Sequence, residues 1–453
     1  MRRVVKVSRI RIIITIIVVV LTTLLTGCTG KEPNEIAYVV ALGIDSTDDD
    51  NYKITIQYAN TTQISGGASE SGGKAGSEIV DNVTIEAPNI YAGVGLANNI
   101  VSKSFSMSHA KLIVFSKEIA EKGVKDMIET LVRSEEIRPD VFIAVANTTA
   151  NDYLTSVNPE MEVNPAQYYQ LICQKNQLVG IPDGQLREFF TGLYTDNYDS
   201  ILPVAGVIEG AGGNSQNDDK GQSKDSQNEG SEGSSESLDS FESKNSDENE
   251  KEKDAEKNTS KYEYDIKNYV GGETAIEKKN KAEAIGAAVF EKDKMVGELG
   301  EVETEICKML KGDYTYSYLT YYNNDTPDIP ITVKTTQQKK PKYKIDTDKK
   351  TVDIELYIES DLYSLPADYN VENKIEDFER DVANYTSSAC TEFINNFTKK
   401  YNSDILKLNE KVKYKFLTNN QYNWFKKNVG WSEYKFSVCT NFKVRRTGLI
   451  VRE

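Results

Sequence analysis

The sequence has 453 residues, enough for two to four domains, with 54 basic and 70 acidic residues and a formal net charge of −16. This acidic balance argues against nucleic acid as a partner, because binding to a phosphate backbone depends on Lys and Arg. There are five widely spaced cysteines and one histidine, with no zinc-site spacing and no CxxC redox motif. We therefore expect no metal and no cofactor.

The N-terminal segment has the layout of a secretion signal. Positions 1–11 hold five basic residues and no acidic one, and the run over 12–27 is almost wholly apolar. It ends in LTGC, which resembles a bacterial lipobox, the signal in which the cysteine receives diacylglycerol and the preceding peptide is removed. We expect 1–27 to be a lipoprotein signal peptide and Cys28 the lipidated N-terminus, held by two acyl chains. The alternative is an uncleaved membrane anchor with an incidental cysteine.

The next portion predicts strands alternating with helices. A β-hairpin is expected over 36–60, around the turn DSTDDDN, which lacks the glycine and distal glutamate of a calcium loop. Strands over 111–115 and 141–147 flank a helix over 116–134 with Ser116 as N-cap, a βαβ unit with parallel pairing. Helices are also expected over 89–105, 149–156 and 164–177, and the stretches 185–196 and 200–207 close this portion.

The cysteines beyond the leader and the single histidine give little sign of chemistry. Cysteines scattered singly in a large chain are commonly buried small hydrophobes, although disulfides are possible, so their pairing is left open. These cysteines are Cys173, Cys307, Cys390 and Cys439. His109 precedes a strand-like run and is interpreted as a structural or surface residue.

An abrupt change of composition marks an acidic insertion. Residues 210–261 contain 14 acidic and 7 basic residues, and their only strong hydrophobes are Leu238 and Phe241. Such a segment cannot bury enough apolar surface to offset its chain entropy, so we expect it to be disordered. The simplest interpretation is a solvated linker; a specific interaction tail is the alternative.

The C-terminal portion predicts a sheet and a long helix. The stretch 284–313 indicates two short strands and a helix closed by Gly312, and 351–365 alternates as a long strand. Hydrophobic residues recur every three or four positions over 371–409, which predicts one long helix packed on a sheet. Other strands are expected over 328–336, 342–346 and from 434 toward the C-terminus.

The order of these segments resembles the Ger(x)C family, the lipoprotein C subunits of spore germinant receptors. The resemblance rests on six stretches in sequence: the lipobox, NEIAYVVALGID, SHAKLIVFSKEIAEKGVKDMIETLVRSEEIRPDVFIAVAN, IGAAVFEKDKMVGEL, KKYNSDILKLNEKV and FKVRRTGLI. It covers about 25–207 and 284–453. Two departures are Thr29-Gly30, where the family usually has Trp-Asp, and the long acidic insertion.

The resemblance implies a multi-domain α+β protein with mixed sheets packed against helices. The domains would be the signal peptide 1–27, an N-terminal α/β domain over 28–207, a disordered acidic insertion over 208–283, and an α+β region over 284–453. The last can be divided at about 284–325 and 326–453. The protein would be anchored on the outer face of the cell membrane, in the spore inner membrane, beside A-type and B-type receptor subunits.

Catalysis is not expected, because the sequence has no nucleophile elbow, phosphate-binding loop or metal cluster. The other class considered is a lipid-anchored solute-binding protein that delivers a ligand to a transporter. That class would show two similar α/β lobes, whereas the two portions here differ in pattern. The sequence therefore favours a non-catalytic scaffold or signalling component of a receptor.

The terminal stretches contribute candidates for a structural role or for contact with a partner: Asp404, Arg445, Arg446 and Gly448. The structural role is favoured. Asp404 could cap a helix or pair within the terminal domain, including with one of the arginines, and Gly448 most simply supplies a turn.

Overall fold

The computed structural model describes most of the two portions that flank the acidic insertion. The described residues are 13–17, 35–49, 51–59, 80–157, 165–174, 180–208, 268–274, 280–322, 330–364 and 374–447. They belong to one compact unit, formed by Met1–Glu209 with Asn268–Glu453. Cys28, Gly448 and residues 210–261 lie outside the described residues, whereas 268–274 and 280–283 of the predicted insertion are described, the last two of them in a strand.

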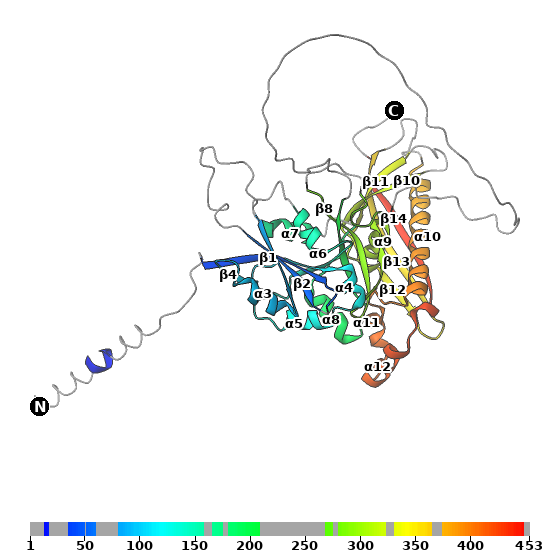
Figure 1. The fold of residues 1–453 in the computed structure, drawn as a ribbon. Coiled ribbons are helices and arrows are strands. Elements are labelled where there is room, and N and C mark those ends of the chain that lie inside the picture. The colour runs from blue at the N-terminus through cyan, green and yellow to red at the C-terminus, as the bar shows by residue number, and fades with distance from the viewer. Residues whose placement is uncertain are drawn as a thin grey trace, which may run out of the picture. The chain divides into compact units, whose positions relative to one another are not determined.

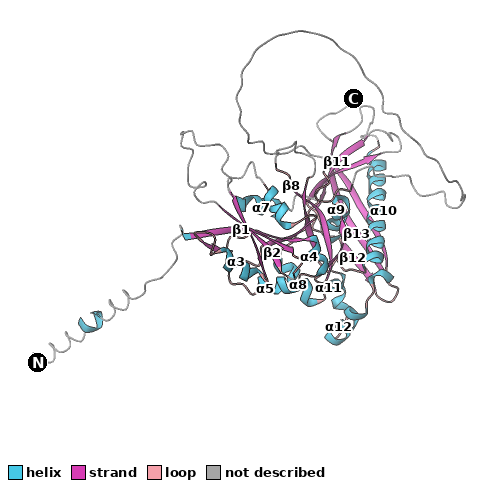
Figure 2. Ribbon diagram, in the orientation of Figure 1, coloured by secondary structure: helices cyan, strands magenta, loops and turns pink. Residues whose placement is uncertain are grey.

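The first sheet has nine strands in the order β3-β2-β1-β5-β6-β7-β8-β9, with β4 paired to β1 (Figures 1 and 2). Its strands are β1 Ile36–Ser46, β2 Tyr52–Ala59, β3 Val80–Ala87, β4 Ser104–Ser106, β5 Leu112–Ser116, β6 Phe142–Ala146, β7 Ile201–Val207, β8 Ala282–Glu291 and β9 Lys294–Leu299. The pairs β1–β4, β1–β5, β5–β6 and β6–β7 are parallel, and the pairs of β2 with β1 and β3 and of β8 with β7 and β9 are antiparallel. The predicted hairpin and parallel crossover are confirmed.

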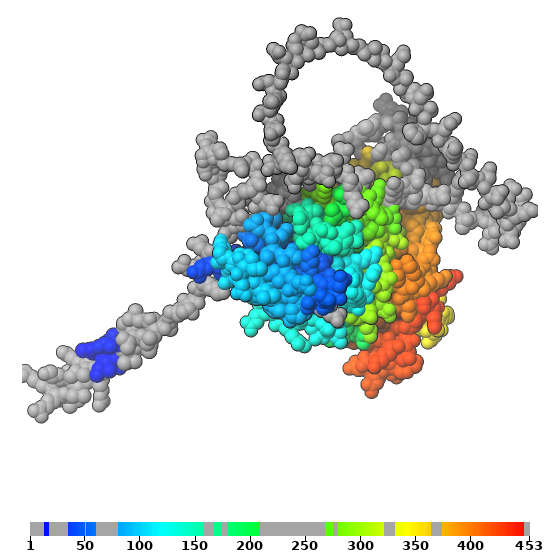
Figure 3. Space-filling view, in the orientation of Figure 1, coloured from blue at the N-terminus to red at the C-terminus, as the bar shows by residue number. Residues whose placement is uncertain are grey.

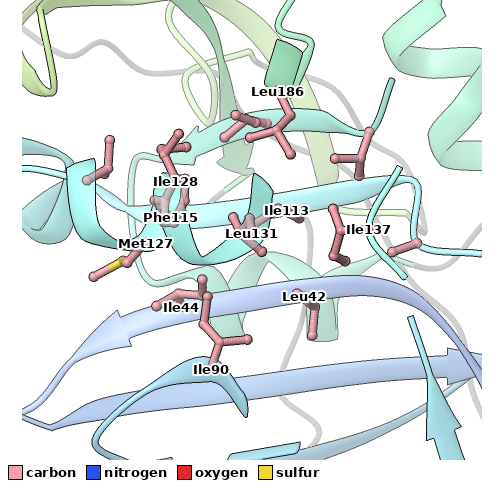
Figure 4. Packing of buried hydrophobic residues seen from close by; sticks show 14 of the residues in the cluster. Leu42, Ile44, Ile90, Ile113, Phe115, Met127, Ile128, Leu131, Ile137 and Leu186 are labelled. Carbon is pink, nitrogen blue, oxygen red and sulfur yellow. The ribbon is translucent and has the colours of Figure 1, made fainter. Parts of the chain in front are cut away.

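Helices cover both faces of this sheet. One face packs on α3 (Ile90–Ala97), α4 (Lys117–Lys122), α5 (Lys125–Val132) and α8 (Leu186–Thr195), and the other on α6 (Ala150–Ser156) and α7 (Pro165–Gln174). Figure 4 shows the first core, where Ile44 and Phe115 from the strands meet Ile90 and Ile128 from the helices. Burial on both faces explains why the parallel strands read as continuous apolar runs.

Two predicted helices of this portion are wrong in extent. The helix expected over 116–134 begins at the predicted Ser116 cap but is broken into α4 and α5 by Gly123, whose φ of 124° is closed to most L-residues. The helix expected over 89–105 ends at Ala97, and the chain then enters β4. Its apolar spacing continues past the end because Val101 still packs on the same core.

Strand β8 joins the portions on either side of the insertion. It pairs with β7 on one edge and β9 on the other, so the first sheet is built from both portions. Its alternate residues serve two cores: Ala288 and Phe290 face the core of the first sheet, and Ala287 and Val289 face a core shared with the C-terminal elements. Helix α9 (Glu301–Lys311) follows, and Gly312 closes it in the left-handed conformation as predicted.

The second sheet has five strands, in the order β10-β11-β13-β12, with β14 on the other edge of β13. Its strands are β10 Tyr316–Tyr322, β11 Pro330–Gln337, β12 Lys342–Asp346, β13 Thr351–Ser364 and β14 Lys435–Arg446. The long β13 is central, and it pairs in parallel with β14 and antiparallel with β11 and β12. The α+β class with mixed sheets packed against helices is therefore confirmed, while β10 was not predicted.

Helix α10 (Ile375–Tyr401) covers the outer edge of β14 with polar side chains. The backbone N–H groups of alternate strand residues donate to side chains on one helix face: Phe436 to Asn395 (3.1 Å), Val438 to Thr391 (3.0 Å), Thr440 to Ser387 (2.9 Å) and Val444 to Glu379 (2.8 Å). Four helical residues rise about 6 Å and two strand residues about 6.7 Å, so the two repeats nearly match. We call these four contacts the α10 ladder; they satisfy an edge that would otherwise be exposed.

The helix predicted over 371–409 is too long at its C-terminal end. It stops at Tyr401 because Asn402 takes the left-handed conformation, with φ of 47°. Ile405 and Leu406, which extend the apolar stripe in the sequence, are buried in a non-helical turn instead. Short helices α11 (Leu408–Val412) and α12 (Asn419–Asn428) follow, and neither was predicted as a separate helix.

Candidate functional site: a polar junction between the two portions

A network of polar contacts joins the loop after α8 to the segment after α10. We call it the junction. Its residues from the first portion are Glu188, Asp196, Asn197, Tyr198 and Asp199, and those from the second are Asp404, Lys407, Asn409, Tyr422 and Lys426. In Figure 1, α8, α11 and α12 lie together at the lower end of the view.

Both sides of the junction are shaped by residues with positive φ. Helix α8 ends at Asp196 (φ 49°) and α10 ends at Asn402 (φ 47°), while Lys407 (φ 57°) precedes α11. Asn and Asp tolerate the left-handed region better than most residues, because their short side chains bond locally. These residues turn the backbone sharply after α8 and after α10, so the two loops meet.

Asp404 lies at the centre of the junction and is 3% exposed. Its carboxylate accepts from the backbone N–H groups of Leu408 and Asn409, both at 2.7 Å, and so caps the first turn of α11. Its backbone exchanges two bonds with Asp199: the Asp199 N–H donates to the Asp404 carbonyl at 3.1 Å, and the Asp404 N–H donates to Asp199 Oδ2 at 2.9 Å.

Burial dominates the electrostatics of Asp404 and raises the pKa of its carboxyl to about 7. The two backbone N–H groups oppose this rise, since they stabilise the charged form, while the charge of Asp199 adds to it. The neighbouring Lys411 has a lowered pKa, again chiefly because it is buried. The junction thus contains a carboxyl that is only partly ionised near neutral pH.

Lysines complete the junction from the second portion. Lys407 Nζ donates to Glu188 Oε1 at 2.9 Å and lies 4.4 Å from the centroid of the Tyr198 ring. Lys426 Nζ donates to the carbonyl of Thr195 at 2.8 Å and to Asn197 Oδ1 at 3.0 Å. Each contact crosses between the portions, so the lysines hold the α8 end against α11 and α12.

A small polar pocket adjoins the junction. It is lined by Asp183, Gly184, Gln185, Glu188, Phe189, Tyr198, Asp199, Ser200, Ile201, Leu202, Lys311 and Lys407. Burial raises the pKa of Asp183, with a further contribution from Glu188. Glu188 is paired with Lys407, and no hydroxyl or thiol on this wall is paired with a base. The lining can position charges but offers no activated nucleophile.

The cysteines of the described portion are chemically quiet. Cys173, Cys307, Cys390 and Cys439 are all free thiols, so their open pairing is resolved in favour of no disulfide. Burial raises the pKa of Cys307 to about 11 and those of Cys173 and Cys390 to about 12, which leaves them as thiols at neutral pH. His109 is exposed and packs edge-on against Tyr38 at 4.6 Å.

The structure separates the candidate residues that the sequence proposed. Asp404 caps α11 and makes none of its described hydrogen bonds to an arginine of β14; Arg445 instead donates to Glu359 at 2.6 Å. Arg446 lies at the end of β14, where it pairs with Asp361, and its side chain is exposed. Contact of these residues with a partner stays a prediction, as does the lipidation of Cys28.

Sequence reasoning missed Lys407, Lys426 and Tyr422. The sequence signal that could have found them is the clustering of lysines and aromatic residues in KLNEKV and YNWFKK. Across the described ranges, no group of three or more His, Cys, Asp or Glu residues is arranged to hold a metal ion. None of the helices in those ranges combines the length and hydrophobicity needed to cross a bilayer.

Comparison with known proteins defines the class. The family model "Spore germination protein N-terminal domain" matches residues 30–207, and "Spore germination B3/ GerAC like, C-terminal" matches residues 285–448. The two matches flank the acidic insertion and between them cover most of the chain. The chain belongs to the Ger(x)C family of spore germination proteins.

Individual relatives agree over shorter stretches. Spore germination protein KC of Bacillus subtilis (strain 168) is 26% identical over 174 residues, which are 35% of this chain and 42% of the relative. Putative spore germination protein YfkR of the same organism is 28% identical over 145 residues, 32% of this chain and 37% of the relative. The matches thus span about two fifths of these curated relatives. A structure described as "Crystal Structure of the GerBC protein" aligns with 89% of this chain and 96% of its own at 15% identity, with a TM-score of 0.48.

Proposed function

We propose that this chain is the lipid-anchored C subunit of a nutrient germinant receptor, held on the outer face of the spore inner membrane. The observation that carries the proposal is the match to both spore germination models, in order, on either side of the insertion. The LTGC boundary after a basic and apolar leader supports anchoring through Cys28. The subunit would act beside A-type and B-type membrane subunits as a scaffold.

The structure supports a scaffold role because the polar groups of the junction contact one another and hold the two portions together. Strand β8 ties the two portions into one sheet, and the junction fixes the loop after α8 against α11 and α12. A partner that binds the first portion would therefore keep a defined position relative to one that binds the second. This rigidity is what a subunit that holds others in register requires.

A non-catalytic role is supported by the state of the reactive groups. Glu188 is engaged by Lys407, and Asp404 is engaged by two backbone N–H groups. The buried thiols have pKa values far above neutral, so they are poor nucleophiles. The solute-binding alternative would call for two similar lobes, whereas the nine-stranded and five-stranded sheets have different strand orders.

Lipid attachment is tested by substitution of the proposed acceptor. Cys28→Ala should abolish incorporation of radiolabelled palmitate into the protein. Cys439→Ala is the matched control, because Cys439 is an exposed free thiol and its loss should leave incorporation unchanged. Palmitate that persists in Cys28→Ala would contradict anchoring at this cysteine, and loss of label in Cys439→Ala would assign the acyl group elsewhere.

A further inference from the structure

The segment Lys413–Asn428 exposes an unusual set of large apolar side chains. Tyr414 is 80% exposed, Leu417 is 95% exposed and Trp424 is 69% exposed, although they lie within eleven residues of one another. We call this segment the tip. Figure 3 shows it projecting from the lower end of the described unit, in orange-red. Single exposed hydrophobes are ordinary, but a group that contains one of the two tryptophans of the chain is not.

The tip is held firmly from within, so its outward residues are displayed by a fixed frame. Phe425 packs against Phe416, with ring centroids 4.9 Å apart, and against Trp431 at 6.2 Å. Tyr422 is buried and donates to the carbonyl of Asn409 at 3.1 Å. Residues two apart on a helix point about 200° apart. Burial of Tyr422 on one face of α12 therefore directs Trp424 outward.

Charge on the tip is opposite to that of the chain. Lys413–Asn428 contains Lys413, Lys415, Lys426 and Lys427 and no acidic residue, in a protein with a net charge of −16. Lys427 is exposed and lies three residues after Trp424, on the same helix face. Lys426 donates to junction residues and Lys415 to the carbonyl of Ile345. Lys413 and Lys427 are exposed, and Lys413 Nζ lies 5.8 Å from the centroid of the Tyr422 ring.

We propose that the tip is a membrane-contact surface that inserts Trp424, Leu417 and Tyr414 at the interface of a bilayer rich in anionic phospholipid. Trp and Tyr favour the headgroup level because their rings are apolar with one polar end, and Leu417 can enter the acyl boundary. Each lysine beside an anionic leaflet adds attraction that an acidic protein otherwise lacks. The tip would give the protein a second contact with the membrane, independent of Cys28.

The two tryptophans provide a direct test on the full chain. Vesicles of phosphatidylcholine with brominated acyl chains, with or without phosphatidylglycerol, quench an indole that enters the bilayer. Quenching should occur with the anionic vesicles and fall strongly with the neutral ones. Trp424→Phe should remove it, because the remaining Trp431 is 2% exposed and within the core.

Charge variants separate lipid attraction from chance contact. Lys413→Glu with Lys427→Glu should reduce the anionic quenching to the neutral level, whereas Lys339→Glu with Lys340→Glu, an equal charge change on exposed residues before β12, should leave it unchanged. Flotation with the vesicles reports the N-terminal anchor separately. Protein that floats without Trp424 quenching in either lipid overturns the tip proposal, leaves the anchor standing and favours a protein partner for this surface. Quenching that persists in the Lys413/Lys427 variant also overturns it.

Discussion

The β7–β8 connection of the first sheet and the outer edge of β14 in the second sheet differ in how much change of sequence they tolerate. In the first sheet the chain leaves at β7 and returns at the neighbouring β8, and the Ile208 N–H donates to the Lys281 carbonyl at 2.9 Å. In the second sheet the outer edge of β14 is closed by the α10 ladder. A long segment can be added between two paired strands at little cost, since loop-closure entropy grows slowly with length. The ladder has no such tolerance, because each of its side chains satisfies a particular N–H group.

Substitutions in the α10 ladder should therefore cause the largest loss of stability. Thr391→Val combined with Asn395→Ala should lower the free energy of unfolding by about 3 kcal/mol, because two N–H groups of β14 and the Phe436 carbonyl lose their partners. Denaturant unfolding of the purified protein measures this. Glu392→Ala, on the exposed face of the same helix, is the control and should change stability by less than about 0.5 kcal/mol. Equal losses of stability in the two variants would show that the ladder contacts contribute no specific stabilisation.

The junction should be the next most sensitive region. Asp404→Ala should cost about 2 kcal/mol, because it leaves the Leu408 and Asn409 N–H groups of a buried turn without an acceptor. Asp404→Asn keeps one acceptor oxygen and should cost less. Thermal unfolding of both variants beside the wild type gives the comparison, and an Asp404→Ala protein as stable as the wild type would show that the cap is dispensable.

The pH dependence of the junction follows from the raised pKa of Asp404. The folded value of about 7 exceeds the ordinary value of 3.8, so between these values the folded state binds more protons than the unfolded state. This contribution to stability is present at low pH and is lost as the pH rises toward 7, at up to about 1.4 kcal/mol per pKa unit.

Asp404→Asn cannot titrate, and it isolates this contribution. The stability of the wild type relative to Asp404→Asn should therefore fall between pH 4.5 and 7.5. Unfolding curves across this range provide the measurement. A difference that stays constant, or grows in favour of the wild type, would mean that Asp404 is ionised throughout.

The insertion should give the smallest effect. Deletion of 210–261 leaves the β7–β8 pairing and the described stretch 268–274 in place, so the melting temperature should change by no more than about 2 °C. Differential scanning calorimetry would show this. A fall of many degrees, or slow hydrogen exchange across the segment in the intact protein, would contradict the prediction that it is disordered and dispensable.

Local patterns predicted much of the fold. The hairpin of β1 and β2 followed from two β-rich runs around an acidic turn, and the parallel crossover followed from a helix of suitable length between two buried strands. The end of α9 followed from Gly312, a residue suited to the left-handed conformation found there. These features depend on residues close in sequence, which is why the sequence could supply them.

Features that depend on distant pairing could not be predicted. Nothing in AIGAAVF indicates that β8 adds to the first sheet beside β7, because the partner precedes it by more than 70 residues. The apolar stripe of α10 runs on into Ile405 and Leu406, since a buried turn and a buried helix face both require hydrophobes. The sequence identified Asp404 as a candidate. Its carboxylate accepts from the Leu408 N–H only because the chain turns at Asn402, and the local sequence does not predict that turn.

Nutrient-triggered germination of spores that lack this chain is the decisive experiment on its proposed role in a germinant receptor. If the protein is a non-catalytic subunit of a germinant receptor, these spores should fail to respond to the cognate nutrient, respond normally to receptor-independent germinants, and recover when the wild-type gene is restored. Loss of absorbance of the spore suspension measures both responses. An unchanged nutrient response, or loss of the receptor-independent response as well, would contradict the proposed role.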